Sequence, residues 1–332
     1  MGKIRRKELK KMKKESMLKN GSLLLKERIS YFNGKYFNPI RSFSMKELKN
    51  ATDDYNTSLI FDHDVGNCIW YKGSLEGRTI SIRTNFYEGV EMAINEIAIA
   101  SQMSSHKNAL KLLGCCLETR IPILVYEFPS GGSLIDRIFS PPNPLSWKSR
   151  LRIAYDIANV IAYLHTAFPR SIIHTDIKPS SFFLDQDCAA KLSDFSLSIT
   201  LPEGEMQVED EIRGTFGYLA PKTLISGVYT EKNDVFSFGI LLLELLIGKR
   251  VHSIMHEERA SIQDYAQSFV NTYDINGTVD PIILAQPRGI HEELQFQAIF
   301  DLAMRCSMKD MDERPTIVNA AKEVRRIQKF VP

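Results

Sequence analysis

The sequence contains few cysteines and no long apolar run. Its five cysteines show neither CxxC spacing nor histidines at metal-ligand intervals, which excludes a disulfide scaffold and indicates a reducing compartment. The longest apolar run, residues 238–248, is interrupted by Glu244 and is shorter than the ~20 residues that span a bilayer. No apolar signal region is present, so we expect a cytoplasmic protein. The cysteines are Cys68, Cys115, Cys116, Cys188 and Cys306.

Glycine and proline are also scarce, with 18 Gly and 14 Pro in 332 residues, which excludes a collagen and a low-complexity chain. The contents of 44% hydrophobic and 25% charged residues are those of an ordinary globular protein. At roughly 100–200 residues per domain, the length allows two or three packing units. The chain therefore has enough apolar residues to form a sizeable core.

Charge is unevenly distributed along the chain. Residues 1–20 contain nine Lys or Arg and two Glu, a charge of +7, so the remaining residues carry −5 of the net +2. A segment this basic can bind an anionic membrane surface or a nucleic acid. We expect a solvated, frayed extension instead and no nucleic-acid partner, because charge runs of this kind are usually solvated.

Periodicity divides the rest of the chain into a strand-rich part and a helix-rich part. Ser44 and Glu47 form a capping box at the start of a helix. Strands are expected at 68–73, 78–84, 109–117 and 121–128, with a helix at 90–103 whose Glu96 faces an interface. Further helices are expected at 147–165, 235–247, 294–306 and 317–327, the second of them buried on all sides.

These elements predict an α+β fold of two lobes. The first lobe is a small antiparallel sheet with one helix, and the second is larger and mainly helical. The expected boundaries are 1–42 for a basic and partly apolar N-terminal extension, 43–128 for the first lobe and 129–332 for the second.

Residues 172–194 bring two acids and a base close together in the sequence: Asp176, Lys178 and Asp194, with His174 beside them. This spacing indicates phosphoryl transfer and resembles the catalytic loop of the protein-kinase fold, with the motif that follows it. The resemblance extends from about residue 43 to the C-terminus. It is carried by HKNALKLLGCCLE (106–118), LVYEF (124–128), GTFGYLAP (214–221), DVFSFGILLLELLIGK (234–249) and ERPT (313–316).

The resemblance assigns roles to particular positions. Asp176 and Lys178 occupy the catalytic positions, and Asp194 occupies that of a metal ligand. Arg83, Glu96 and Ser181 occupy positions of the nucleotide site, where the family has Lys, Glu and Asn. The other departures from the family pattern are His63, Val65 and Cys68 at the three glycine positions, Thr175, Ser196 and Lys222.

These replacements predict a catalytically impaired pseudokinase. Without the glycines the backbone cannot approach phosphates, and Arg is not equivalent to Lys at a site shaped for a point charge. Ser181 lacks the amide oxygen that binds metal, and Lys222 is expected to face Arg314 as a like charge. We expect no required cofactor, with weak or absent ATP and Mg²⁺ binding. The alternative is a weakly active ATP-dependent serine/threonine kinase.

Several distinctive strings resemble the plant receptor-like cytoplasmic pseudokinases called ZRK. They are NGSLLLKERISYFNGKYFNPIRSFS (20–44), SQMSSHKNALKLLGCCLE (101–118), YLHTAFP (163–169) and LPEGE (201–205). The resemblance implies an adaptor in plant immune signalling that links a coiled-coil NLR receptor to receptor-like cytoplasmic kinases, some members being modified by pathogen effectors. It implies a cytoplasmic location, at the inner face of the plasma membrane only through partners or the basic tail.

Two further segments are candidates for partner contacts. Residues 20–44 are too apolar for a free linker, so we expect them to pack on the first lobe or on a partner. Residues 201–211 contain five acids and no Lys or Arg, and Glu209, Asp210 and Thr215 are the expected partner-binding residues. This segment is expected either to become ordered on a partner or to remain a mobile surface loop.

Overall fold

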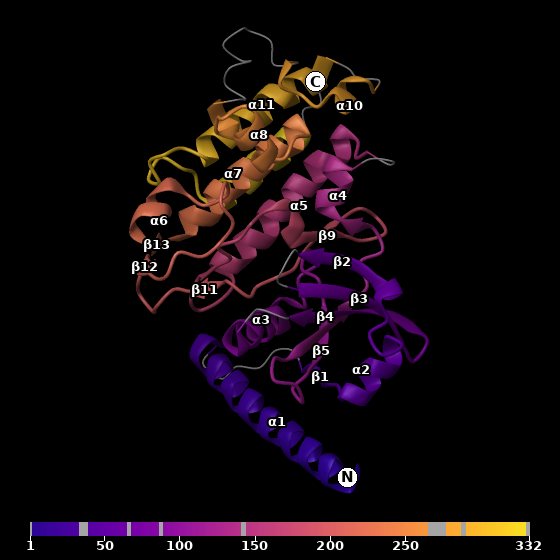
Figure 1. The fold of residues 1–332 in the computed structure, drawn as a ribbon. Coiled ribbons are helices and arrows are strands. Elements are labelled where there is room, and N and C mark those ends of the chain that lie inside the picture. The colour runs from indigo at the N-terminus through magenta and orange to yellow at the C-terminus, as the bar shows by residue number, and fades with distance from the viewer. Residues whose placement is uncertain are drawn as a thin grey trace. The chain divides into compact units, whose positions relative to one another are not determined.

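The computed structural model describes residues 2–32, 39–64, 68–85, 89–140, 144–264, 277–286 and 290–329. The chain divides into two compact units (Figure 1). The first unit is Met1–Ser130 with Ser193–Leu197, and the second is Gly131–Leu192 with Ser198–Pro332. The first is built on a sheet and the second is mainly helical, which confirms the expected α+β fold.

The first unit contains a six-stranded sheet in the order β1-β5-β6-β4-β3-β2. β1 runs parallel to β5, and the other neighbours are antiparallel. The expected strand positions are confirmed, although β5 and β6 are shorter than predicted. The strands are β1 (Arg41–Ser42), β2 (Ile60–Asp64), β3 (Cys68–Leu75), β4 (Arg78–Asn85), β5 (Leu112–Cys116) and β6 (Ile123–Glu127).

The turn between β3 and β4 fixes the register of the predicted hairpin. Leu75 pairs with Arg78, so Glu76 and Gly77 form a two-residue loop. Both have positive φ, 52° and 75°, which is the conformation whose twist suits a tight hairpin. This register places Arg83 opposite Leu124 of β6, in the middle of the sheet.

Two helices, α2 and α3, pack against the sheet of the first unit. The capping box predicted at Ser44 and Glu47 is present at the start of α2 (Met45–Ala51), which buries Leu48 against the sheet. The second helix, α3 (Val90–Met103), has the predicted bounds, and Glu96 on it is completely buried, as expected.

The expectation of a frayed N-terminal extension is wrong. Residues Gly2–Phe32 form one long helix, α1, which contacts α3 within the first unit (Figure 1). Lys13 Nζ lies 2.8 Å from Glu118 Oε2, and Asn20 Nδ2 donates to the Thr119 carbonyl at 2.9 Å. Leu24 and Phe32 are buried, which confirms that this apolar segment packs on the first lobe; residues 33–38 lie outside the described residues.

The second unit is arranged around α7 (Glu231–Ile247), which is buried on all sides as predicted. α11 (Ile290–Cys306) and α5 (Trp147–Thr166) pack against α7, and α12 (Ile317–Gln328) packs on α5. The shorter helices are α4 (Leu134–Phe139), α6 (Pro221–Ser226), α8 (Val251–Glu257), α10 (Pro281–Leu284) and the 3₁₀ turn η2 (Pro179–Ser181).

Three small sheets are present among the described residues of the second unit. The first has the order β10-β9-β7, and the other two are the pairs β11-β8 and β12-β13. Among the described residues, no helix is long and apolar enough to cross a membrane. The strands are β7 (Gly132–Ser133), β8 (Ile172–Ile173), β9 (Phe182–Leu184), β10 (Ala190–Leu192), β11 (Ile199–Thr200), β12 (Val208–Glu209) and β13 (Val228–Tyr229).

Adjacent leucines of α1 test whether this helix is part of the folded unit. Leu24 is 7% exposed and Leu25 is 60% exposed. Leu24→Ala should lower the free energy of unfolding by about 2–5 kcal/mol because it removes buried methyl groups. The matched control Leu25→Ala should change it by less than about 0.5 kcal/mol. Urea unfolding measures both values, and equal effects would contradict the packing of α1.

Candidate functional site

The first unit contains a buried cation with two carboxylate partners. Arg83 on β4 forms an ion pair with Glu96 on α3, and the two side chains are 1% and 0% exposed. Tyr126 on β6 donates a hydrogen bond to the other oxygen of Glu96. Burial, and then the charge of Glu96, hold the pKa of Tyr126 well above its usual range. Tyr126 was not among the predicted site residues, and its position on β6 gave no signal for this role.

Asp194 is the second carboxylate partner of Arg83. Its Oδ1 lies 3.1 Å from Arg83 Nη2 and accepts a hydrogen bond from Ser196 Oγ at 2.7 Å. Asn95 on α3 donates to the carbonyls of Phe195 and Ser196 and so holds this segment against the helix. Ser196 replaces the glycine of the family motif, and its hydroxyl therefore binds the carboxylate that the resemblance assigns to metal.

The predicted glycine positions lie where β2 and β3 meet. His63 pairs with Ile69 and Asp64 pairs with Cys68, so the ladder continues to the last residues described there. Cys68 is buried. Val65, the middle one of the three positions, lies outside the described residues.

The catalytic-loop residues of the second unit hold one another. Asp176 Oδ2 lies 2.8 Å from Lys178 Nζ, which also donates to Thr215 Oγ1 at 2.7 Å. Ser181 Oγ donates to the Asp176 carbonyl at 2.7 Å, and Asp176 and Ser181 are both buried. Asp176, Lys178, Ser181 and Thr215 thus form one cluster, whereas Asp194 belongs to the first unit.

Asp234, in the first turn of α7, fixes the backbone of this loop. It accepts hydrogen bonds from the backbone N–H groups of His174 and Thr175, at 2.8 and 2.9 Å, and His165 Nε2 lies 2.8 Å from it. Thr175 has φ 71°, an unusual value for a β-branched residue. The surrounding hydrogen bonds compensate for this conformation, so the loop shape is maintained by α7. This role of His165 was missed in the sequence because the residue lies in the last turn of a regular amphipathic helix, α5.

The acidic segment is partly folded within the chain itself. Val208 and Glu209 of β12 pair with β13, and the Asp210 N–H donates to the Gly227 carbonyl. Asp210 also forms an ion pair with Arg213, at 2.6 Å. The expectation that this segment lacks order without a partner is therefore wrong for residues 208–213, because its own strand pair holds it. Glu209 remains exposed and Asp210 is half-buried.

Tyr218 and the start of α8 are joined by a buried carboxylate on α7. The Tyr218 hydroxyl lies 2.8 Å from both oxygens of Glu244, and the Val251 N–H donates to Glu244 Oε1 at 2.8 Å. Burial raises the pKa of Glu244 to about 8, although the two hydrogen bonds act in the opposite direction. Glu244 therefore joins the segment around Tyr218 to the first residue of α8.

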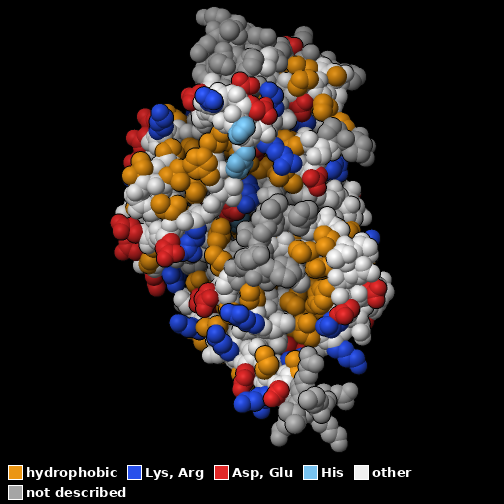
Figure 2. Space-filling model, in the orientation of Figure 1, with side chains coloured by type: hydrophobic (Ala, Val, Ile, Leu, Met, Phe, Trp, Pro, Cys, Tyr) orange, Lys and Arg blue, Asp and Glu red, His pale blue; other side chains and the backbone are white. Residues whose placement is uncertain are grey.

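The α6–α8 groove, of about 450 Å³, is mainly apolar. Figure 2 shows hydrophobic side chains gathered at the surface where Figure 1 places α6, α7 and α8. Beside the groove, Ile225 is 87% exposed. Three methionines in the lining, with unbranched and flexible side chains, make this an adaptable apolar surface. The lining includes Phe216, Leu219, Leu224, Phe236, Val251, Met255, Met304 and Met308.

Lys222 does not face Arg314 as a like charge, contrary to the expectation from the sequence. Lys222 Nζ contacts Met311 Sδ at 3.3 Å. The Arg314 guanidinium donates to the carbonyls of Met308 and Lys232 and lies 4.9 Å from the centre of the Phe236 ring. Burial lowers the pKa of Arg314 to about 10. Backbone carbonyls therefore take the place of the missing acid.

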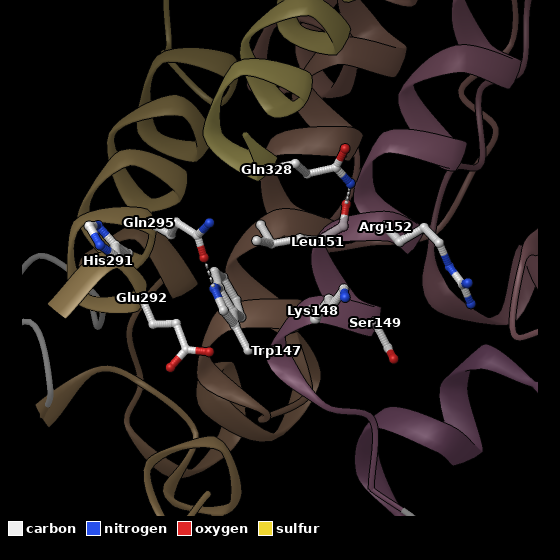
Figure 3. A pocket seen from close by; sticks show the side chains of 9 residues that line it. All are labelled: Trp147, Lys148, Ser149, Leu151, Arg152, His291, Glu292, Gln295 and Gln328. Atoms are coloured by element: carbon white, nitrogen blue, oxygen red, sulfur yellow. Dashed lines mark hydrogen bonds between the residues drawn. The ribbon is translucent and has the colours of Figure 1, made fainter. Parts of the chain in front are cut away.

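A second hollow, of about 500 Å³, lies among α5, α11 and α12 (Figure 3). Trp147 Nε1 donates to Gln295 Oε1 at 2.9 Å, and Gln328 Nε2 donates to the Leu151 carbonyl at 2.8 Å. These bonds connect the three helices. None of the predicted site residues lines this hollow, so we assign it a packing role. Within the described part of the chain, no group of three or more His, Cys, Asp or Glu could hold a metal ion.

A sheet lobe with a buried cation–Glu pair, a helical lobe and a His-x-Asp catalytic loop define the protein-kinase class. The family model described as Protein kinase domain matches residues 78–324. The chain belongs to this family and resembles its ZRK group. It is 40% identical to "Non-functional pseudokinase ZED1" of Arabidopsis thaliana, over 96% of this chain and 98% of the relative.

Two other relatives from the same plant differ in their stated catalytic status. The chain is 38% identical to "Serine/threonine-protein kinase ZRK1", over 95% of this chain and 93% of the relative. It is 37% identical to "Non-functional pseudokinase ZRK2", over 94% and 89%. The predicted family is confirmed, and the protein has a kinase-like or pseudokinase role.

The buried carboxyl of Glu244 predicts a pH dependence of stability. Its folded-state pKa of about 8 lies above the usual 4.5, so the folded chain retains a proton that the unfolded chain releases. Stability should therefore fall as the pH rises from about 5 to about 8, by up to ~1.4 kcal/mol per pH unit. Glu244→Gln should abolish this decrease in urea unfolding.

The matched control is Glu257→Gln, the same change at an exposed position on α8. It should keep the pH dependence of the wild type. A Glu244→Gln variant with the wild-type slope would show that the carboxyl titrates normally in the folded chain.

Proposed function

We propose that this chain is a pseudokinase adaptor that does not transfer phosphate at a useful rate. The observation that carries this proposal is the double pairing of Arg83 with Glu96 and Asp194. In the family pattern, a Lys at this position binds nucleotide phosphates and the Asp binds Mg²⁺. Here the guanidinium and the carboxylate bind each other.

The Arg83–Asp194 pairing is the part that opposes binding of a metal-loaded nucleotide. A buried cation–Glu pair such as Arg83–Glu96 is also formed in active kinases, whereas the Asp at position 194 would there be directed to Mg²⁺. The hydroxyl of Ser196 also binds Asp194 Oδ1, so an arriving metal ion would compete with two donors. These residues do not fit ATP with Mg²⁺, and we propose weak or absent binding.

The catalytic loop supports the same proposal. Ser181 is shorter than the family's Asn, and its hydroxyl donates to the Asp176 carbonyl. An Asn side chain would offer a metal ion an amide oxygen, which a serine lacks. Asp176 and Lys178 pair with each other, and Asp234 fixes their loop through its backbone. Their retention is accounted for by these structural bonds.

The adaptor role follows from the resemblance to the ZRK group, and we propose the partners that it implies. These are a coiled-coil NLR receptor and receptor-like cytoplasmic kinases, with pathogen effectors as modifiers of the assembly. The site of action is the cytoplasm, with access to the inner plasma-membrane face through partners or the basic helix. For the kinase partner, we propose the face that contains Glu209, Asp210, Thr215 and the α6–α8 groove.

Charge and hydrophobicity support this docking face. β12 presents Glu209 at the surface, and Glu211 is also exposed. Asp210 bonds to Gly227, which directly follows α6, so these acids lie at one end of the helix that lines the groove. Exposed apolar patches beside acidic residues suit a partner with a basic rim, whose charge steers its approach.

A weakly active serine/threonine kinase is the second candidate. The Asp176–Lys178–Thr215 arrangement favours it, because it is the cluster that a phosphoacceptor would approach in the family. Two of the relatives, ZRK1 and ZRK4, are also named as serine/threonine kinases.

Phosphotransfer separates the two candidates. The purified chain with Mg-ATP should incorporate no radiolabelled phosphate into itself or into a generic substrate, while an active kinase assayed in parallel does. Arg83→Lys alone should restore no activity, because Ser181 and Ser196 remain. Mg-ATP should stabilise the folded chain, as followed by thermal shift, by much less than the ~2.7 kcal/mol that a ligand supplies at a hundredfold excess over its Kd. Incorporation that disappears in Asp176→Asn would establish the second candidate.

Charge reversal tests the docking face. Glu209→Lys with Glu211→Lys should abolish capture of the partner kinase and leave capture of the NLR receptor intact in separate pull-downs. Asp210 is left unchanged because it pairs with Arg213 and supports the fold. The matched control, Glu293→Lys with Asp301→Lys, changes the charge equally at exposed positions of α11 and should retain both partners. Unchanged kinase capture, or loss of both partners, refutes the assignment.

A further inference from the structure

α1 presents a second face that the fold of its own unit does not use. Its packed face has a spacing of four residues, at Asn20, Leu24, Arg28 and Phe32, all of them buried. On another side of the helix, three large apolar side chains remain in solvent. Leu18, Leu25 and Ile29 are 66%, 60% and 54% exposed.

These exposed residues follow a heptad pattern. Leu18, Ser22, Leu25 and Ile29 are separated by four, three and four residues, the spacing of a helix seam that packs against a second helix. In this register Leu18 and Leu25 occupy the d positions, and Ser22 and Ile29 the a positions. We call these four residues the α1 seam.

Three of the positions that flank the α1 seam are exposed lysines, and the g positions within the seam are Gly21 and the buried Arg28. Lys19 and Lys26 occupy e positions and Lys14 occupies a g position, and all three are exposed. Side chains at e and g face those of the partner helix and determine which partner and orientation are favoured. The apolar pattern ends before Leu18, because the preceding d and a positions are Lys11 and Glu15, which form an ion pair at 3.8 Å.

We propose that the α1 seam binds an amphipathic helix of a partner protein with acidic residues at the flanking positions. The charges argue against a second copy of this chain, because two seams face to face would bring lysines against lysines. They are complementary to an acidic helix. The seam is narrow and contains Ser22, whereas a helix that lies on a membrane buries a broad apolar face, so the pattern favours a protein helix.

The structure also makes this face ready for binding. The ion pair of Lys13 with Glu118 and the hydrogen bonds of Asn20 hold α1 on the first unit, so the helix is formed before a partner arrives. A preformed helix avoids the ordering cost of a disordered segment. The proposal goes beyond the docking face of the second unit, and it depends neither on that face nor on catalytic status.

The experiment uses the full chain and designed peptides as probes. One peptide, about four heptads long, has Leu at a and d and Glu at e and g; its counterpart has Lys at e and g. The Glu peptide should bind in fluorescence anisotropy, more weakly at high salt, and the Lys peptide should not. Leu18→Gln with Leu25→Gln and Ile29→Gln should weaken binding about tenfold or more, with an unchanged melting temperature.

Two further variants make the test specific. Lys14→Glu with Lys19→Glu and Lys26→Glu should reverse the preference, so that the Lys peptide binds. The matched control, Leu9→Gln with Met12→Gln, removes exposed apolar side chains of α1 that lie outside the α1 seam and should leave binding unchanged.

Several results of these measurements would overturn the proposal. Absence of Glu-peptide binding, or equal binding of both peptides, refutes the proposal. Sedimentation with phosphatidylserine-containing vesicles that requires Leu18, Leu25 and Ile29, without peptide binding, would assign the face to an anionic membrane and also refute it.

Discussion

The burial of one cation, Arg83, determines the arrangement of the first unit's site. An arginine side chain stays protonated in proteins, so a buried guanidinium needs carboxylates and oriented acceptors around it. Glu96 from α3 and Asp194 from a segment 111 residues further along the chain meet this requirement. The side chain of Arg83 thereby connects strand β4 to helix α3 and to the loop that contains Asp194. The contact with Asp194 engages a carboxylate that an active kinase would direct to metal.

In the second unit, α7 supplies a similar constraint through two buried acidic side chains. Asp234 holds the catalytic-loop backbone, and Glu244 holds Tyr218 and the start of α8. Both accept hydrogen bonds from segments distant in sequence, so the loops keep their shape through α7. A catalytic loop can therefore retain its residues for structural reasons. The surface that these loops support, acidic at one end and apolar in the α6–α8 groove, is then available for protein contacts.

The expectations that failed depended on how a segment packs. The basic N-terminal segment was predicted to be frayed because its charges dominate its composition, yet Lys, Leu, Met and Glu are good helix formers. The four-residue spacing of Asn20, Leu24, Arg28 and Phe32 was the available signal. It is masked by other apolar residues, such as Leu25, that remain in solvent. Only the packed structure distinguishes the two sets.

The sequence by itself determined the elements whose signals lie within a few residues. The capping box of Ser44 and Glu47, the bounds of α3 and the wholly buried α7 could be predicted because caps and periodicity are local. The family and the two-lobed class followed from motifs in the same way. Only the tertiary structure decided that Arg83 binds Asp194 and that Ser196 shares that carboxylate. These are contacts between distant residues, and their partners depend on which groups the folded chain removes from water together.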